Sequence, residues 1–342
     1  MFIDPHVHCR DGKQAYKETI SHALSVAERA GFTAIFDMPN TDPPITNREQ
    51  VVERLKIAEK SNSSVFYGVR MAMTTDISQI KEAVDTYKEF FPQVIGFKLY
   101  AGHSVGNIGV IDVKDQQRIY ATLRDCGYEG VLTVHCEKES LLKPDLWDPR
   151  NPITQAYARP PEAEVESVRD QISIARSTEF SGTLHIAHIS VPEAVDLVRE
   201  AKKHIRVTCG ATPHHIILDM NIMKSENGLL YKINSPLRPR EMVDKLLSCL
   251  KQGKIDWIET DHAPHTLEEK LKSPYMSGMP ALHYYPRFIE WLRKSGFGEN
   301  QIRELTFGNI VKAYGISLKP RQAVPSLELG SEYPFDPFKG IF

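Results

Sequence analysis

Short apolar runs alternate with longer amphipathic segments along the whole chain. The apolar runs lie at residues 2–8, 32–37, 65–70, 94–99, 130–135, 183–188, 205–209 and 255–260. Between them apolar side chains recur at helical spacing, most clearly over residues 16–30, 47–60 and 163–178. We interpret the runs as strands and the intervening segments as helices. This alternation favours an α/β protein with a (β/α)8 barrel, whose functional site lies at the C-terminal ends of the strands.

The length of the chain fits one barrel domain. Its 342 residues predict a single domain over 1–342, in which the tail from about 316 to 342 packs on the barrel. A doubly wound sheet would usually need a glycine-rich phosphate turn after the first strand, and the sequence has none there. Long segments follow the fifth and seventh predicted strands, at 136–160 and 210–238. Loops in this position carry function in barrels, so both are of interest.

Composition excludes several partners and compartments. The chain carries 42 Lys and Arg against 44 Asp and Glu, a formal net charge of -2, so bulk charge gives no reason to expect nucleic acid or an anionic membrane surface as a partner. No signal peptide or transmembrane run is visible. The five cysteines are an odd number, lie far apart and form no CxxC motif. This pattern favours reduced thiols and a cytoplasmic protein over a disulfide framework.

Side chains that commonly bind metals end several of the predicted strands. His6 and His8 are two residues apart, so they point to the same face of the first strand, and imidazole is a standard zinc ligand. Lys98 interrupts an apolar strand, where an ammonium group is costly unless it is paired or chemically changed. The ends of three other strands supply further candidates: His135, His185 with His188, and Asp261. Together these residues predict a metal site at the mouth of the barrel.

This set of residues resembles the amidohydrolase superfamily of metal-dependent barrel hydrolases. The resemblance rests on Asp4-x-His6-x-His8, a strand-end lysine, two later strand-end histidines and a final strand-end aspartate. Four motifs are similar, more narrowly, to the dihydroorotase family: His6-Val7-His8-Cys9-Arg10-Asp11-Gly12, Met38-Pro39-Asn40-Thr41, Lys98-Leu99-Tyr100 and Asp261-His262-Ala263-Pro264-His265. The similarity runs from residue 2 to roughly 315. The length resembles the shorter, barrel-only members, whereas residues 159–164 and 212–215 resemble the longer ones.

The resemblance implies a centre of two Zn2+ ions bridged by a carboxylated lysine. In that arrangement Lys98 has taken up carbon dioxide and forms an N6-carbamate between the metals. The other ligands implied are His6, His8 and Asp261 for the first metal, and His135 and His188 for the second. Asp261 would also carry a proton from the attacking water to the leaving amide nitrogen. Two alternatives stay open: a single-metal site without carboxylation, and a plain Lys98 amine paired with Asp261 or Glu137.

Arg10 is the residue that distinguishes the candidate substrates. Dihydroorotate differs from hydantoins and dihydropyrimidines by a ring carboxylate, and a guanidinium matches a carboxylate with two parallel hydrogen bonds. Asn40 and His265 are candidates for the same carboxylate, and Asn234 and the backbone at 278–280 for the ring amide. The resemblance therefore implies reversible hydrolysis of (S)-dihydroorotate to N-carbamoyl-L-aspartate, a step in de novo pyrimidine synthesis.

Other interpretations stay open beside this one. A related cyclic amidase acting on allantoin, hydantoin or dihydropyrimidines would use the same metals without needing Arg10. A non-catalytic barrel that assists another pyrimidine enzyme would have lost ligands, and none is missing here. The resemblance also implies either a homodimer or a complex with aspartate transcarbamoylase. His185 lies deeper than His188 on the opposite strand face, which predicts a role in the core. His103, in the glycine-rich stretch 101–109, is a candidate for a loop over the pocket.

Overall fold

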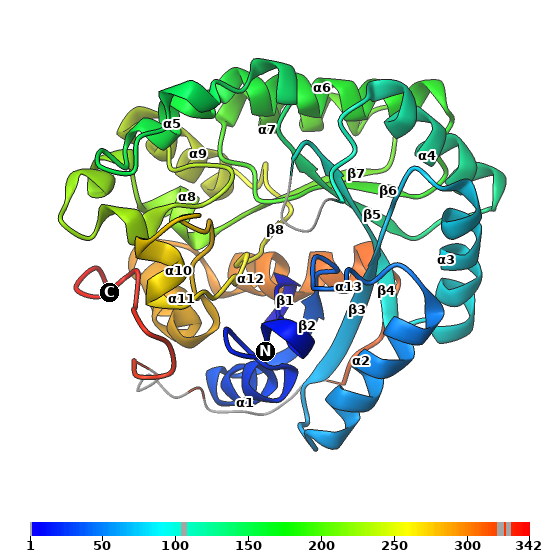
Figure 1. Cartoon of the computed structure of the whole chain (residues 1–342), viewed down its shortest axis with the longest axis horizontal. Helices are drawn as coiled ribbons and strands as arrows, with labels where there is room; N and C mark the ends of the chain where they lie inside the picture. The colour runs from blue at the N-terminus through cyan, green and yellow to red at the C-terminus, as the bar shows by residue number, and fades with distance from the viewer. Residues whose placement is uncertain (1, 104–107, 320–324, 326–329) are drawn as a thin grey trace.

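The computed structural model describes residues 2–103, 108–319, 325 and 330–342, and its centre is a nearly closed barrel of eight parallel strands (Figure 1). Each strand pairs with the next one along the chain. The strands are β1 (Phe2–Val7), β2 (Phe32–Asp37), β3 (Phe66–Ala72), β4 (Val94–Ala101), β5 (Val131–Cys136), β6 (Thr183–Ile186), β7 (Val207–Ala211) and β8 (Trp257–Ile258). All eight predicted strands are present, so the (β/α)8 prediction is confirmed.

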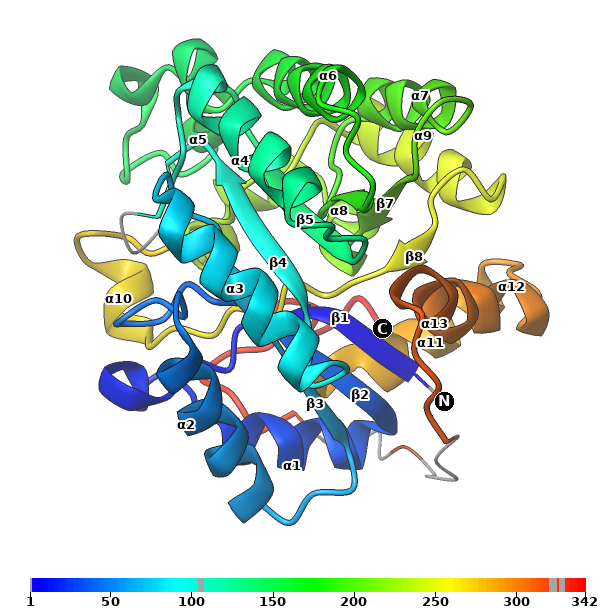
Figure 2. The ribbon, with the colours of Figure 1, turned by 90° about the vertical axis from the view of Figure 1, so that its right-hand side faces the viewer.

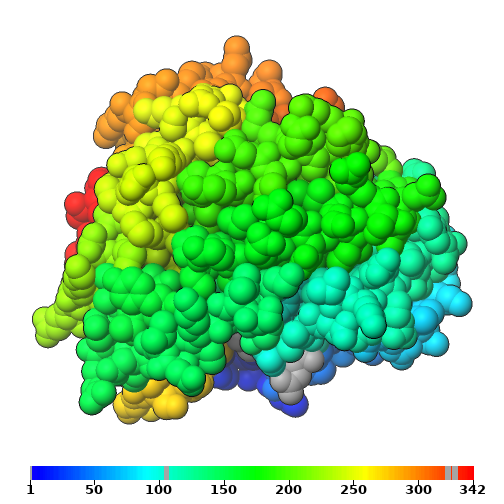
Figure 3. All heavy atoms as spheres, turned by 90° about the horizontal axis from the view of Figure 1, so that it is seen from above, coloured from blue at the N-terminus to red at the C-terminus, as the bar shows by residue number. Residues whose placement is uncertain are grey.

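Helices surround the barrel, as the two ribbon views show (Figures 1 and 2). They are α1 (Ile20–Ala30), α2 (Arg48–Lys60), α3 (Ile77–Phe90), α4 (Val113–Asp125), α5 (Thr154–Ala158), α6 (Pro161–Ser177), α7 (Pro192–Ala201), α8 (Pro213–Ile217), α9 (Arg240–Lys251), α10 (Leu267–Leu271), α11 (Tyr285–Lys294), α12 (Glu299–Arg303) and α13 (Asn309–Tyr314). A space-filling view from the side of α6 and α7 shows their side chains as a continuous outer layer (Figure 3).

The starts of the predicted helices follow from local capping. A capping box, formed by Asn47 and Gln50, begins α2 within one residue of the predicted start. The first helix was predicted from residue 16, but α1 begins at Ile20. The Thr19 side chain accepts a hydrogen bond from the His22 backbone N–H and caps the helix there. Tyr16 therefore lies in the preceding turn, with an exposed side chain.

The barrel closes through side chains as well as through the backbone. The prediction gave the eighth strand residues 255–260, whereas regular pairing of β8 with β7 covers only Trp257 and Ile258. Beyond it, Val7 and His262 form an isolated bridge. The Asp4 carboxylate accepts hydrogen bonds from the Thr260 backbone N–H at 3.1 Å and hydroxyl at 2.5 Å. A buried carboxylate thus joins β1 to the segment after β8, where no regular ladder is formed.

The N-terminal end of the barrel is filled by the segment that follows α12. Ile310 and Tyr314 pack in one apolar cluster with Ile3, Phe36 and Trp257 from the strands. The C-terminal tail reaches the other side of the core, where Tyr333 and Phe338 are buried. The C-terminal end of the strands is not filled by this cluster and is therefore the end at which a functional site can form.

The cysteines and the helix lengths agree with what the composition indicates. All five cysteines carry free thiols, as predicted. No helix in the described part of the chain combines the length and the apolar character needed to cross a bilayer.

Candidate active site

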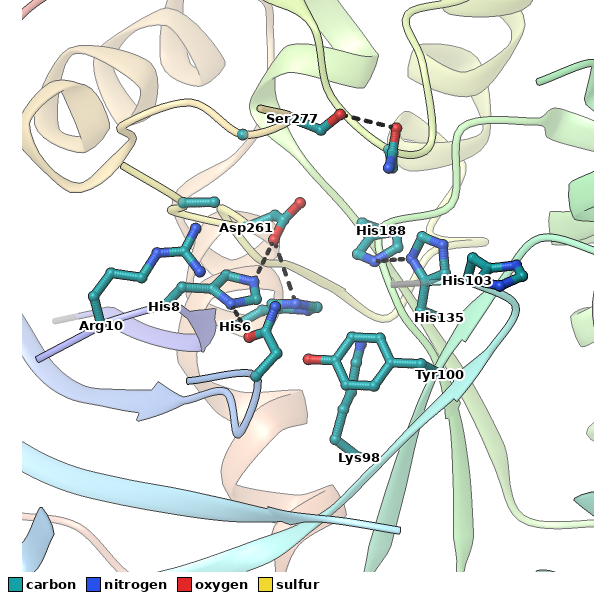
Figure 4. A pocket seen from close by; sticks show the side chains of 14 residues that line it. His6, His8, Arg10, Lys98, Tyr100, His103, His135, His188, Asp261 and Ser277 are labelled. Atoms are coloured by element: carbon teal, nitrogen blue, oxygen red, sulfur yellow. Dashed lines mark hydrogen bonds and ion pairs between the residues drawn. The ribbon is translucent and has the colours of Figure 1, made fainter. Parts of the chain in front are cut away.

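The side chains predicted at the strand ends, except His185, line one pocket at the C-terminal mouth of the barrel (Figure 4). Its walls comprise His6, His8, Arg10, Asn40, Lys98, Tyr100, His103, His135, His188, Asn234, Asp261, Ala263, Ser277 and Gly278. Among the predicted site residues, only His265 lies outside this lining, and it contacts Arg10 from behind. Side chains far apart in the sequence thus converge here because parallel strands end at one face.

His6, His8 and Asp261 form one group of metal-ligand atoms. Their nearest donor atoms all lie within 4.8 Å of one another. The Asp261 carboxylate is 3.4 Å from His6 Nε2 and 3.0 Å from His8 Nε2. Asp261 has a left-handed backbone, with φ of 49°. Such a conformation is costly for a non-glycine residue and concentrates at functional sites.

His135 and His188 form a second group across the pocket. His135 Nδ1 and His188 Nε2 lie 3.2 Å apart. The other ring nitrogen of His135 faces the Glu137 carboxylate at 2.9 Å, and Arg159 pairs with that carboxylate from outside. Burial alone would raise the pKa of Glu137, but the Arg159 guanidinium and His135 hold it well below its usual range. An ionised acceptor therefore fixes the orientation of the His135 ring.

Lys98 lies between the two groups with no partner for its amine. Its side chain is fully buried, and Nζ has no hydrogen bond to any residue that the structure describes. The amine lies over the Tyr100 ring, 5.0 Å from its centre. Burial lowers the pKa of Lys98 to about 8. The salt bridge to Asp261 or Glu137, considered as an alternative, is not formed, so the amine is an unsatisfied group inside the pocket.

The histidines are arranged as neutral ligands. Burial, with the nearby Lys98 charge, lowers the pKa of His6 to about 3, and burial also lowers those of His8 and His188 well below the usual value. His8 Nδ1 faces the Asn40 side-chain oxygen at 2.6 Å, so its proton is held there and the Nε2 lone pair is left for a cation beside the Asp261 carboxylate. Outer partners of this kind orient metal-binding imidazoles. The donor set, the ring orientations and the orphaned Lys98 amine fit a metal centre.

Glu259 is a functional residue that the sequence interpretation missed. Its carboxylate accepts hydrogen bonds from His185 Nε2 at 3.0 Å, from Trp257 Nε1 at 3.3 Å and from the His188 backbone N–H, and lies 3.8 Å from His6 Nδ1. Gly210 makes room for it, because a Cβ there would be 2.6 Å from the Glu259 carboxyl carbon. The sequence does contain a signal for Glu259, because a carboxylate inside the apolar run 255–260 must be paired or functional.

Arg10 enters the pocket from a strained turn. Arg10 and Asp11 have left-handed backbones, with φ of 52° and 68°. The Asp11 carboxylate accepts from the Ile20 backbone N–H at 2.9 Å, and Arg54 donates to the Arg10 carbonyl at 2.6 Å. The Arg10 guanidinium is buried and donates to His265 Nε2 at 3.2 Å, while its Nε has no partner among the described residues. The guanidinium thus keeps one buried donor, Nε, without a partner, and the side chain lines the pocket.

Of the other predicted residues, two line the pocket, one lies in the core and one lies at the pocket edge. Asn40 lines the pocket with its oxygen engaged by His8, and Asn234 lines it near Ser277. His185 is buried, bonded to Glu259 and Thr208, and does not line the pocket, as expected for a core residue. His103 lies at the edge and pairs with Glu139 at 2.8 Å. Residues 104–107 of the predicted loop lie outside the described residues.

Comparison with curated proteins identifies dihydroorotases from archaea and bacteria as relatives. The chain is 31% identical over 329 residues to the dihydroorotase of Methanothermobacter thermautotrophicus, covering 94% of this chain and 70% of that protein. It is 33% identical to the dihydroorotase of Methanosphaera stadtmanae and 32% to that of Fusobacterium nucleatum. The chain spans 62% and 61% of the length of these two proteins. A scan against protein-family models finds no match.

Comparison with solved structures supports the same fold. L-hydantoinase (dihydropyrimidinase) from Arthrobacter aurescens superposes with a TM-score of 0.81 over 97% of this chain and 73% of that chain, at 22% identity. Dihydroorotase from Campylobacter jejuni superposes with a TM-score of 0.72 over 93% of this chain and 84% of that chain, at 18% identity. At such identities the likeness concerns the barrel alone.

Glu259 should be needed for metal binding although it is not among the predicted ligands. Glu259→Gln removes the charge facing His6 and His185, and loss of such an outer partner typically lowers metal affinity about 10- to 100-fold. Competition with a chelator measures that affinity. Glu200→Gln, at an exposed carboxylate that pairs with Lys203, is the matched control and should bind metal normally. Unchanged affinity in Glu259→Gln would show that the carboxylate merely fills space.

Proposed function

Because this chain belongs to the dihydroorotase family of the amidohydrolase superfamily, we propose that it hydrolyses the cyclic amide of (S)-dihydroorotate to N-carbamoyl-L-aspartate and catalyses the reverse ring closure. The observation that carries this proposal is the buried Arg10 guanidinium beside the ligand set. A buried cation with unused donors suits a ring carboxylate, which hydantoin and dihydropyrimidine rings lack. The reaction is a step of de novo pyrimidine synthesis.

The proposal includes two Zn2+ ions. His6, His8 and Asp261 would hold one, and His135 and His188 the other. Lys98 would bridge them after its amine attacks carbon dioxide, forming an N–C bond and releasing a proton to solvent. This turns an unsatisfied amine into an anion with two oxygens, which is the chemical reason for proposing it. When bound, such a metal pair polarises the scissile carbonyl and makes water a better nucleophile.

Asp261 is the proposed proton carrier. Burial raises the pKa of its carboxyl, so it can accept a proton from the attacking water more readily than an exposed aspartate. It then gives that proton to the amide nitrogen as the C–N bond breaks. In ring closure the same carboxyl group acts in the opposite order.

Arg10 would hold the substrate carboxylate. His265 accepts from the guanidinium, and burial lowers the pKa of His265 to about 3, so it stays neutral and does not repel the arginine. Asn40, whose oxygen is engaged by His8, has only its amide N–H groups to offer the same carboxylate. Arg10 and Asn40 would thus orient the ring with its amide toward the metals.

Family membership also supports the proposal of a cytoplasmic enzyme that assembles as a homodimer or with aspartate transcarbamoylase. Light scattering of the purified protein, alone and mixed with the transcarbamoylase of the same organism, tests both assemblies. A monodisperse monomer in each sample would contradict them.

Lys98→Ala should lose metal and activity together. The variant has no group to carboxylate, and short carboxylic acids should restore part of the activity by supplying a bridging anion. Metal analysis and a dihydroorotate assay measure the two losses. A crystal structure of active, metal-loaded protein with a plain amine and one metal would contradict the carbamate.

Asp261→Asn should keep most of the fold and lower kcat by on the order of 10²–10⁴, the usual contribution of a positioned acid–base group. Circular dichroism and metal content establish that the variant is folded and loaded. Near-normal turnover would assign the proton transfer to another residue.

Arg10→Met should lower kcat/KM for dihydroorotate about 100-fold or more, because removing one partner of a buried charged pair costs roughly 2–5 kcal/mol. Slow hydrolysis of dihydrouracil, which has no carboxylate, should be nearly unchanged and is the internal control. Equal losses on both rings would mean that Arg10 supports the metal centre. No loss on either ring would favour a hydantoinase-like activity instead.

A further inference from the structure

We infer that Gln155 fixes the Asn234 amide as a hydrogen-bond donor toward the pocket, so that this wall of the site selects a ring carbonyl oxygen. Gln155 belongs to α5, within the long segment after β5, and is buried with 2% of its surface exposed. Asn234 lines the pocket and also a neighbouring cavity, and Gln155 lines only that neighbouring cavity. The inference rests on the proposed function only for the identity of the ring.

The Gln155 amide has one orientation that its surroundings allow. Its nitrogen donates to the Ile233 backbone carbonyl and, at 3.0 Å, to the Asn234 side-chain oxygen. A backbone carbonyl can only accept, so the Gln155 nitrogen must face it. Both Gln155 amide hydrogens are then used, and the second requires an acceptor. Asn234 must therefore turn its oxygen, and not its nitrogen, toward Gln155.

Ser277 supports the same orientation from another side, because its hydroxyl donates to the Asn234 oxygen. The Lys232 ammonium donates to the Ser277 hydroxyl at 2.9 Å and to the Tyr275 carbonyl at 2.6 Å. An ammonium cannot accept, so the Ser277 oxygen accepts from it and its own hydrogen is free. That hydrogen is donated to the Asn234 oxygen at 3.2 Å, the contact drawn above the pocket in Figure 4. Two independent donors thus occupy this oxygen.

The Asn234 nitrogen is left with both of its N–H groups. No hydrogen bond to Asn234 Nδ2 occurs within the part of the chain that the structure describes. Dihydroorotate has two ring carbonyls, and the one being hydrolysed must face the metal ligands. The other, between the two ring nitrogens, is the acceptor that Asn234 can bind. Gln155 is accordingly a positioning residue, which acts on the ring through Asn234.

Replacement of that ring oxygen by sulfur tests the inference. The metal-loaded enzyme should prefer dihydroorotate over its 2-thioxo analogue, because a thiocarbonyl is the weaker acceptor. Gln155→Leu should reduce this preference about 3- to 10-fold, the range expected for one hydrogen bond, with the change mainly in KM. The chemical effect of sulfur on the reaction is common to both enzymes and cancels in the ratio. An unchanged preference in a folded, metal-loaded variant would overturn the inference.

Two further variants separate positioning from a general loss of stability. Gln171→Leu is the matched control, since this glutamine is also buried but bonds Tyr120 and Gln116 away from the pocket, and it should leave the preference unchanged. Ser277→Ala, at a partly exposed position, removes the second donor and should reduce the preference without touching Gln155. A reduction in Gln171→Leu equal to that in Gln155→Leu would count against the inference.

Hydantoin and 2-thiohydantoin distinguish a failure of this inference from a failure of the proposed function. Both rings have the same carbonyl position without the carboxylate. Turnover of hydantoin but not dihydroorotate, with a Gln155-dependent preference for oxygen, would overturn the proposed function and support the role of Gln155. Turnover of dihydroorotate with a preference for oxygen that does not depend on Gln155 would support the proposed function and overturn the role of Gln155.

Discussion

The ionised Glu259 carboxylate lies in the interior of the barrel, and the arrangement of the candidate centre depends on how that charge is satisfied. An unpaired carboxylate in such a place is strongly unfavourable, so it must have hydrogen-bond donors. Burial alone would raise the pKa of Glu259, but His185 and His6 hold it well below its usual value. The same carboxylate accepts the His188 backbone N–H. One buried charge after β8 therefore lies against the segments from β1 and β6 that carry candidate metal ligands.

Further buried carboxylates lie in the strands, in the segments after them and in α6, and each accepts hydrogen bonds or an ion pair from another part of the chain. Asp37, at the end of β2, accepts from Tyr67 of β3 and pairs with Arg54 of α2. Other carboxylates of this kind are Asp4 with Thr260, Glu137 with Arg159 and His135, and Glu164 with Ser190 and Arg238. Removing one partner leaves a buried charge unpaired and destabilises the folded state, so these pairs hold the segments that carry them in place. The ligand side chains inherit their positions from this framework.

The two sides of the pocket are built differently. The candidate metal-ligand side chains come from the strands or from the first three residues after them. The side that would face the rest of a substrate is made by loop residues such as Arg10, Asn234 and Ser277. Their orientation is set by hydrogen bonds from behind, as His265 does for Arg10 and Gln155 for Asn234. A barrel can thus keep its metal chemistry while loop residues decide which ring is bound.

The sequence by itself determined the eight strands, the barrel class and most residues that line the pocket. It could do so because strand period and ligand chemistry are local properties: His6 and His8 share a face, and Lys98 is conspicuous in an apolar run. Tertiary structure alone decided the contacts of Glu259 and Gln155, the shortness of β8, and the contact between His265 and Arg10. These features depend on donors and acceptors that meet across the barrel from distant positions. No local pattern encodes such a meeting, because it is fixed only when buried polar groups must satisfy one another in the folded chain.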